Sequence, residues 1–323
     1  MTEVDARAEP VRAAQPAEPA EPAGRFARQV AAVAPDPDGA PGRYRVDVDA
    51  GWNCPTVPQG GLMAALAARA MAAEVGDPSQ VLRTLTTVFA APVPAGPVVV
   101  DVDLLRRGRS ISQATATVRA EGADAGHTTV AVFGRARTGF ALTDSRMPEV
   151  PGPLDCPSFR DPPPPEFDDG EPFEVPFWDH IEGRPALGHA PWERYVPERS
   201  DCAFWYRFDE PPRRADGTLD PLALVTLCDT MPSSVGERMG PDEPERWWAP
   251  SADLTVHLVG EARSEWVLAH LRAHRAGEGY ASAEVALWDP DPACGLVAFA
   301  TQVMIFTFPA PPDPARLVPS DQR

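Results

Sequence analysis

The sequence lacks features that several functional classes require. Its 29 Lys and Arg residues are outnumbered by 47 Asp and Glu residues, which gives a formal net charge of −18. Nucleic acids and anionic membrane surfaces both bind basic faces of proteins. No apolar run approaches the ~18 residues of a membrane span, and residues 1–11 lack the basic-then-apolar pattern of a signal peptide. These absences predict a cytoplasmic protein without a nucleic-acid or membrane partner.

Cysteine and histidine are also scarce. The five cysteines are an odd number without a closely spaced pair, so neither a disulfide framework nor a zinc knuckle is indicated. Free cysteines of this kind are commonly buried. The six histidines contain no pair with metal-ligand spacing. The sequence therefore predicts no metal site.

What the chain does contain is enough apolar material for a large core, because 43% of its 323 residues are hydrophobic. Shifts in composition divide it into segments. Residues 1–25, rich in Ala, Pro and Glu, are predicted to be a disordered arm. Residues 143–174 include "RDPPPPEFDDGEP" and are predicted to be an extended linker. Two units remain, 26–142 and 175–308, followed by a tail at 309–323.

The two units share an internal repeat. A shift of 169 residues aligns identical residues without a gap, among them Arg69 with Arg238, Leu85-Thr86 with Leu254-Thr255, and Arg106 with Arg275. The expected elements also recur in the same order. The first unit has a helix at 60–77 and alternating strands at 98–105, 112–120 and 128–136. The second has a helix at 222–239 and strands at 253–259, 265–275, 280–288 and 296–308. We predict an α+β fold with two helix-on-antiparallel-sheet units whose sheets pair edge to edge.

A family resemblance rests on motifs that occur in a fixed order along residues 51–308. They are "GGLMAALAARA", "TTVFAAPVPAGPVVVDVDLLRRGRSIS", "CDTMP", "SADLTVHLV", "EWVL" and "GLVAFATQVM". In these motifs the chain resembles the acyl-CoA thioesterase II family and its thioesterase-like relatives, which have a tandem, or double, hot-dog fold. The resemblance implies an enzyme of lipid metabolism that hydrolyses acyl-CoA thioesters without a cofactor, a metal or a covalent intermediate. Hot-dog sheets commonly associate further, which allows a homo-oligomer.

The resemblance also assigns catalytic residues. The family Asp on the second helix corresponds to Asp229, and the family Gln on the last strand corresponds to Gln302. The family Thr falls on Ser251, which keeps the hydroxyl but lacks the methyl group that restrains the rotamer. The family often carries an aromatic residue or His before the paired glycines, where this chain has Gln59.

The same residues suit the chemistry when considered without the family. Thioester hydrolysis needs a placed water, a proton acceptor and donors for the oxyanion, and Asp229 can supply the first two functions. Under the 169-residue shift Asp229, Gln302 and Ser251 fall on nonpolar residues: Gly60, Phe133 and Leu82. We therefore expect one site per chain, on the second unit.

Structural interpretations remain open for each of these residues. Asp229 could be a helix N-cap, with Pro232 in the first turn. Gln302 could be a strand side chain that faces solvent or bonds to neighbouring backbone. Ser251 could be a turn or strand-start hydroxyl.

Substrate-binding residues are also predicted. Gly60 and Gly61 open a helix, whose amides can stabilise an oxyanion or simply allow close packing. Arg106, Arg107 and Arg109 could bind coenzyme A phosphates or form a solvated turn between strands. An apolar channel for the acyl chain is expected between the units, lined by Leu62, Leu66, Met231 and Val235.

Other functions fit the sequence less well. A hot-dog dehydratase or hydratase would need His together with Asp229 on the helix, and the position five residues later is Ser234. A serine hydrolase would need a G-x-S-x-G elbow, which is absent. The alternative to the enzyme is a non-catalytic acyl-CoA or acyl-carrier binding protein on the same scaffold.

Overall fold

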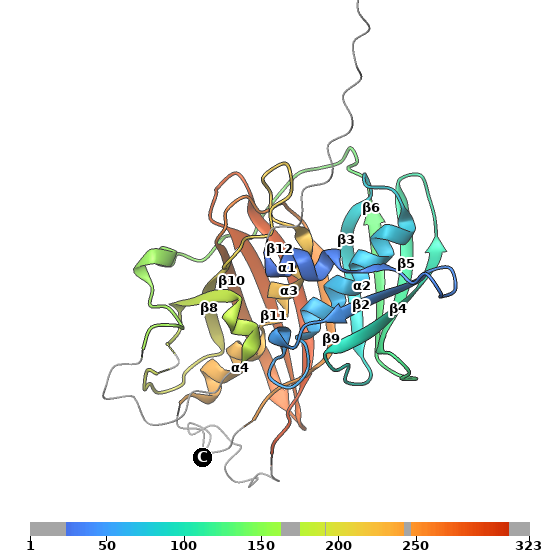
Figure 1. Ribbon diagram of the computed structural model, residues 1–323. Helices are drawn as coiled ribbons and strands as arrows, with labels where there is room; N and C mark the ends of the chain where they lie inside the picture. Colours follow the sequence, from blue (N-terminus) through green and yellow to red (C-terminus); the bar gives the residue numbers. More distant parts are fainter. Residues whose placement is uncertain (1–23, 163–174, 191, 242–246, 310–323) are drawn as a thin grey trace, which may run out of the picture.

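The computed structural model describes residues 24–162, 175–190, 192–241 and 247–309, and their strands form one twelve-stranded antiparallel sheet with the helices on one side (Figure 1). The strand order is β1-β2-β4-β5-β6-β3-β9-β12-β11-β10-β8-β7. The first unit contains α1 (Arg25–Ala31), β1 (Ala34–Pro35), β2 (Arg43–Val48), η1 (Ala50–Trp52), α2 (Gly60–Val75), β3 (Val81–Phe89), β4 (Gly96–Arg106), β5 (Ile111–Ala120) and β6 (His127–Gly134). Then follow η2 (Pro153–Asp155), η4 (Pro176–Asp179), β7 (Ile181–Leu187), β8 (Asp201–Phe208), α3 (Pro221–Cys228), α4 (Pro232–Met239), β9 (Ser251–Leu258), β10 (Val267–Gly277), β11 (Tyr280–Asp289) and β12 (Gly295–Ile305).

The two halves of the sheet join through β3 and β9. Thr86 lies opposite Thr255 in this antiparallel pair, and their Oγ1 atoms are 3.1 Å apart. These two residues are also partners under the 169-residue shift. In an antiparallel pair a residue faces its own repeat partner only at a two-fold axis, so a pseudo-two-fold axis passes between them. The predicted edge-to-edge pairing of two sheets is therefore confirmed.

Each strand predicted from alternation is present, but other strands were missed. The segments expected at 112–120 and 280–288 are β5 and β11, and the remaining predicted strands also fall close to their expected places. β2 and β3 were not predicted, although both alternate in burial. β8 was not predicted, because six of its eight residues are buried and no alternation is visible. Both of its faces are covered.

The single helix expected at 222–239 is divided into α3 and α4. The ring of Pro232 would clash with the carbonyl of Cys228 four residues earlier in a continuous helix, and α3 ends at Cys228. α3 begins at Pro221, where the side chain of Asp220 accepts a hydrogen bond from the Leu222 amide at 2.9 Å. Under the 169-residue shift α4 falls on residues 63–70, inside α2, whereas α3 falls on residues 52–59, before α2 begins. Asp229 therefore comes after α3, whereas its aligned partner Gly60 begins α2.

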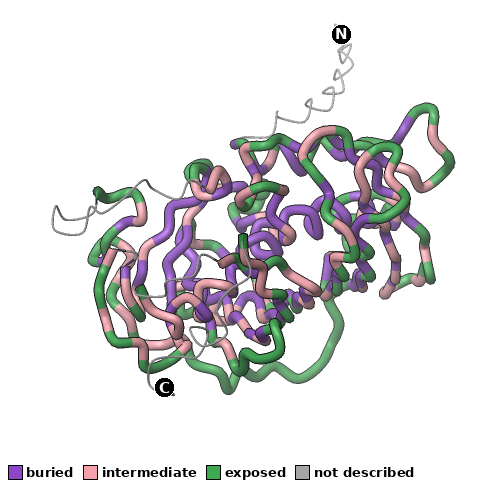
Figure 2. Tube along the Cα trace, turned by 90° about the horizontal axis from the view of Figure 1, so that it is seen from below, coloured by how far each residue is buried: buried purple, intermediate pink, exposed green. Residues whose placement is uncertain are grey.

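α2 lies between the sheet and α3. Leu62, Met63 and the alanines of its middle turns are buried on all sides, as expected for a helix that is apolar around its whole circumference. Gly76 ends the helix in the left-handed conformation, with φ of 67°. Figure 2 shows that the buried segments are concentrated in the middle of the molecule. None of the helices in the described part of the chain is long and apolar enough to cross a membrane.

Part of the predicted linker packs against the second unit. The indole of Trp205 donates to the carbonyl of Pro151 at 2.9 Å, and Arg184 donates to the carbonyl of Cys156 at 2.9 Å. Cys156 belongs to a small apolar cluster with Trp205, Trp266 and Trp288, which covers the second face of β8. The predicted arm and tail lie almost wholly outside the described residues, as does most of the proline run. The predicted segment boundaries stay predictions.

Candidate active site

Asp229, Ser251 and Gln302 come together where α3 ends beside β9 and β12. The Ser251 hydroxyl donates to Oδ1 of Asp229 at 2.9 Å, and Nε2 of Gln302 donates to the same oxygen at 2.5 Å. Gln302 also donates to the Ser251 hydroxyl. Gln302 is only 2% exposed, so it does not face solvent. The three residues assigned by resemblance thus form one hydrogen-bonded cluster.

The second carboxylate oxygen of Asp229 reaches the other unit. Oδ2 accepts a hydrogen bond from the amide of Gly61 at 2.8 Å, at the N-terminus of α2. Asp229 is not the N-cap of α4, because Met231 occupies that position. It acts instead as an acceptor at the start of the first unit's helix, where the helix dipole favours a negative charge.

The paired glycines allow this approach. A Cβ atom on Gly60 would lie 2.9 Å from Oδ2 of Asp229 and 2.9 Å from the ring of Phe89. A Cβ atom on Gly61 would lie 2.9 Å from both Cβ of Asp229 and the carbonyl oxygen of Val225. The sequence left two roles open for these glycines, oxyanion stabilisation and close packing. The short distances show that both glycines are needed for close packing. The Gly61 amide is already bonded to Asp229, so it supports the carboxylate.

Gln59 links the start of α2 to the end of α3. Its Oε1 accepts from the amide of Leu62 at 2.8 Å and so caps α2. Its Nε2 donates to the carbonyls of Thr226 and Asp229, both at 2.9 Å. The side chain is 3% exposed. Sequence reasoning noted Gln59 only as a departure from the family pattern and gave it no role.

Burial raises the pKa of Asp229 to about 6, although hydrogen bonds from Ser251, Gly61, Gln302 and Gly60 act in the opposite direction. A carboxylate that titrates near neutrality can accept a proton from water and return it. Desolvation by the surrounding chain and the charge of Asp229 raise the pKa of the Cys54 thiol to about 12, although the residue as a whole is exposed, so this thiol stays protonated. Burial lowers the pKa of His127 to about 4; its ring packs against Phe89 with centroids 4.8 Å apart.

The predicted arginine cluster lies elsewhere. Arg106, Arg107 and Arg109 are exposed, in and around the turn between β4 and β5. Arg107 donates to the carbonyl of Glu74 at 2.7 Å, at the C-terminal end of α2. At 1.5 Å per residue this end is about 20 Å from Gly61. The structure therefore does not bring these arginines to the carboxylate.

The predicted channel residues are also separated. Leu62, Leu66 and Met231 are fully buried members of the main core. Val235 lines a cavity of about 640 Å³ in the second unit. Three of the four residues thus lie in the packed core and not along this cavity. Among the described residues, no group of three or more His, Cys, Asp or Glu side chains is placed to hold a metal ion.

Comparison with known proteins identifies the family. A model of the acyl-CoA thioesterase N-terminal domain matches residues 48–134, and a model of the acyl-CoA thioesterase C-terminal domain matches residues 153–306. Together these matches cover most of the chain. No curated protein matches.

Solved structures show the same fold. A protein of unknown function with a hot-dog fold from Alicyclobacillus acidocaldarius is 25% identical, with a TM-score of 0.68 over 88% of this chain and 98% of that one. Acyl-CoA thioesterase II TesB2 from Mycobacterium marinum is 20% identical, with a TM-score of 0.67 over 87% and 98%. The TesB protein of Mycobacterium avium subs paratuberculosis is 17% identical, with a TM-score of 0.65 over 87% and 98%. The chain, with two hot-dog units on one antiparallel sheet, belongs to the acyl-CoA thioesterase family.

Proposed function

We propose that the protein hydrolyses acyl-CoA thioesters by direct attack of water, with Asp229 as the general base. The observation that carries this proposal is the carboxylate itself. It is held by Ser251 and Gln302 from its own unit and by Gly61 from the other unit, and it titrates at about 6. A partly buried carboxylate with its pKa raised in this way is suited to move a proton at neutral pH.

The reaction balances without a covalent intermediate. The water oxygen attacks the thioester carbonyl carbon while Asp229 takes one of the water protons, and the carbonyl oxygen becomes negatively charged. When this intermediate collapses, the carbon–sulfur bond breaks, and Asp229 gives its proton to the departing coenzyme A thiolate. The products are the free acid and the thiol, and Asp229 is again a carboxylate.

Ser251 and Gln302 have positioning roles in this scheme, because both donate to the oxygen of Asp229 that would face the water. The Gly61 amide is used by Asp229, so the oxyanion is stabilised mainly by the electropositive start of α2. The Oε1 atom of Gln302 is buried without a hydrogen-bond partner among the described residues. In this scheme Oε1 of Gln302 accepts a hydrogen bond from the attacking water.

The test is a panel of acyl-CoA thioesters from acetyl to palmitoyl, together with an acyl-carrier-protein thioester, assayed for released thiol. Release from at least one acyl-CoA that depends on Asp229 is the expected result. If no thioester is cleaved but acyl-CoA binds, the protein is a binding protein on the thioesterase scaffold.

A further inference from the structure

The side of the sheet that faces away from the helices is uncovered over its central strands. The helices of the described residues lie on the other side (Figure 1). Over β8 the uncovered side is closed by the linker, because Met147 and Val150 pack against the cluster that contains Trp205. The region over β5, β6, β3, β9 and β12, called the central face below, keeps three valines at 50%, 45% and 38% exposure: Val88, Val130 and Val303.

The strand register defines the rows of the central face. Directly paired residues project to the same side of a sheet. From β5 to β12 the middle row is Thr115, Val130, Thr86, Thr255 and Thr301. One neighbouring row contains Val88, Asp253 and Val303, and the other contains Thr84, His257 and Phe299. Across these five strands the three rows include one carboxylate and no Lys or Arg, in a chain with a net charge of −18.

The polar groups of the central face are bonded within the sheet. The Oγ1 atoms of Thr86 and Thr255 are 3.1 Å apart, and Oγ1 of Thr84 donates to a main-chain carbonyl of β9 at 2.8 Å. The carboxylate of Asp253 accepts from a main-chain amide of β12 at 2.8 Å. Polar groups that already have partners lose little when water is removed. The methyl groups of the threonines remain free for contact, so this surface can be buried as an apolar one.

The size of the central face suits a protein–protein contact. Five strands about 4.8 Å apart and three rows about 6.8 Å apart span roughly 24 by 20 Å. Two such faces packed together would bury about 1,000 Å² in total, which is near the lower limit for a specific interface.

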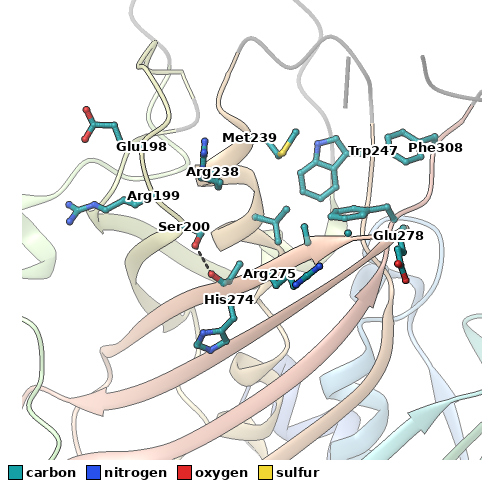
Figure 3. A pocket seen from close by; sticks show the side chains of 16 residues that line it. Glu198, Arg199, Ser200, Arg238, Met239, Trp247, His274, Arg275, Glu278 and Phe308 are labelled. Carbon is teal, nitrogen blue, oxygen red and sulfur yellow. Dashed lines mark hydrogen bonds between the residues drawn. The ribbon is translucent and has the colours of Figure 1, made fainter. Parts of the chain in front are cut away.

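A cavity of about 640 Å³ beside the end of α4 offers a contrast (Figure 3). Met239 and Trp247 line it, but Figure 3 shows charged side chains around them: Glu198, Arg199, Arg238, Arg275 and Glu278. A protein that covered this region would have to remove these charges from water. The central face carries only the charge of Asp253, so its burial costs less.

We propose that the central face binds the same face of a second copy of the chain, in a dimer with two-fold symmetry. Such an interface uses one patch on both copies, and the pseudo-two-fold axis between Thr86 and Thr255 gives the two halves of this patch similar shapes. An anionic partner would find no Lys or Arg here, and a basic partner would find only Asp253. An identical uncharged face is the matching surface. Gln302 and the carboxylate cluster lie on the opposite side of the sheet, so the dimer leaves the site uncovered.

The test is the mass of the full-length wild type, measured by light scattering during size-exclusion chromatography at increasing protein concentration. The chain has a mass of 34.7 kDa, and the mass should rise to twice this value. Because both copies carry a net charge of −18, added NaCl should screen their repulsion and lower the dimer Kd. A wild type that stays monomeric at every concentration and salt level would overturn the inference.

Substitutions locate the interface. Val130→Arg places a charge in the middle row, and a two-fold dimer would bury it twice, so the dimer Kd should rise at least ~100-fold. Thr301→Arg tests the same row on the other side of the pseudo-two-fold axis and should have the same effect, so one variant decides if the other fails to fold by circular dichroism. Both positions are exposed in the monomer.

Val196→Arg is the matched control. Val196 is 79% exposed, and it lies beside α4, because the hydroxyl of its neighbour Tyr195 donates to the main-chain carbonyl of Glu237 at 3.2 Å. This variant should keep the wild-type Kd. A dimer that persists unchanged in the folded central-face variants, or that Val196→Arg weakens equally, would be formed by another surface and would overturn the inference.

Discussion

The carboxylate of Asp229 lies 2.8 Å from the amide nitrogen of Gly61, although the two residues belong to different units. The other carboxylate oxygen is held by Ser251 and Gln302 of its own unit. The carboxylate is therefore fixed from both sides of the junction between the units. A change on either side should alter its position or its protonation, which makes each contact testable by itself.

Asp229→Asn is expected to reduce thiol release from acyl-CoA by ~10²–10⁴-fold, the usual contribution of general-base catalysis. The amide oxygen of Asn can still accept from Gly61. Its NH₂ group can donate to Oε1 of Gln302, which has no other partner among the described residues, if the Gln302 amide turns over. Fold and acyl-CoA binding should therefore persist, as calorimetry can measure. Near-normal turnover in a variant that only melts earlier would make Asp229 a structural residue.

The same variant should change how stability depends on pH. Burial raises the pKa of Asp229 from 3.8 to about 6, so between these values the folded protein binds the proton more tightly than the unfolded chain does. Wild-type stability contributed by this group therefore falls as pH rises, by about 3 kcal/mol at most. Asn has no charge to bury. The Tm of Asp229→Asn relative to wild type should rise from pH 4 to pH 7 and then level off; a constant difference would show that the pKa is not raised.

Gln302→Ala should lose less turnover than Asp229→Asn, and Ser251→Ala should lose least. Gln302 donates to both Asp229 and Ser251, whereas Ser251 donates only to Asp229. Both hydrogen bonds lower the pKa of Asp229. Each loss should therefore move the acidic limb of the kcat/KM profile above its wild-type position near pH 6. Ser251→Thr keeps the hydroxyl and is the control; an unmoved limb in both alanine variants would contradict these contacts.

Sequence reasoning succeeded where a pattern is local or repeated. Alternation and the repeat predict β4 to β6 and β9 to β12, and the family resemblance implies the cluster of Asp229, Ser251 and Gln302. β2 and β3 were missed, although both alternate in burial. The single helix predicted at 222–239 misses the break after Cys228. The alternative that put Pro232 in a first turn matches the start of α4, but with Met231 and not Asp229 as the N-cap. The contact of Arg107 with the C-terminal end of α2 depends on tertiary packing. Alternation within a strand gives no information about such packing, so this position could not be predicted.

Gly61→Ala tests the close approach of the two units. Helix propensity alone would favour Ala over Gly by about 1 kcal/mol. The new Cβ atom would lie 2.9 Å from the Val225 carbonyl oxygen and 3.0 Å from that of Thr226, and backbone atoms cannot move aside cheaply. Overpacking of this kind costs about 1–3 kcal/mol, so the steric cost should win. Thermal melting should show a lower Tm and assays a lower kcat. Gly236→Ala, in α4 and with no atom within 4 Å of the added Cβ, controls for the loss of a helical glycine.

Gln59 should prove to be a positioning residue for Asp229. Gln59→Leu removes three buried hydrogen bonds, to the Leu62 amide and to the carbonyls of Thr226 and Asp229. Each backbone group left unsatisfied costs about 1–3 kcal/mol, so Tm should fall. The end of α3 is also released from the start of α2. We therefore expect kcat to fall by ~10–100-fold, less than the full loss of a general base, and the acidic limb of the pH profile to move.

Gln29 is the matched control for this experiment. It is 7% exposed, and it donates to the carbonyl of Asp47 at 2.9 Å and accepts from the amide of Asp49 at 3.0 Å, but it contacts no residue of the carboxylate cluster. Gln29→Leu should lower Tm without moving the pH profile or lowering kcat at temperatures where the protein is folded. Gln59→His keeps a ring donor and should recover part of the activity. If Gln59→Leu and Gln29→Leu had equal kcat, the effect of Gln59→Leu would come from lost stability alone. Gln59 would then be a helix cap and not a positioning residue.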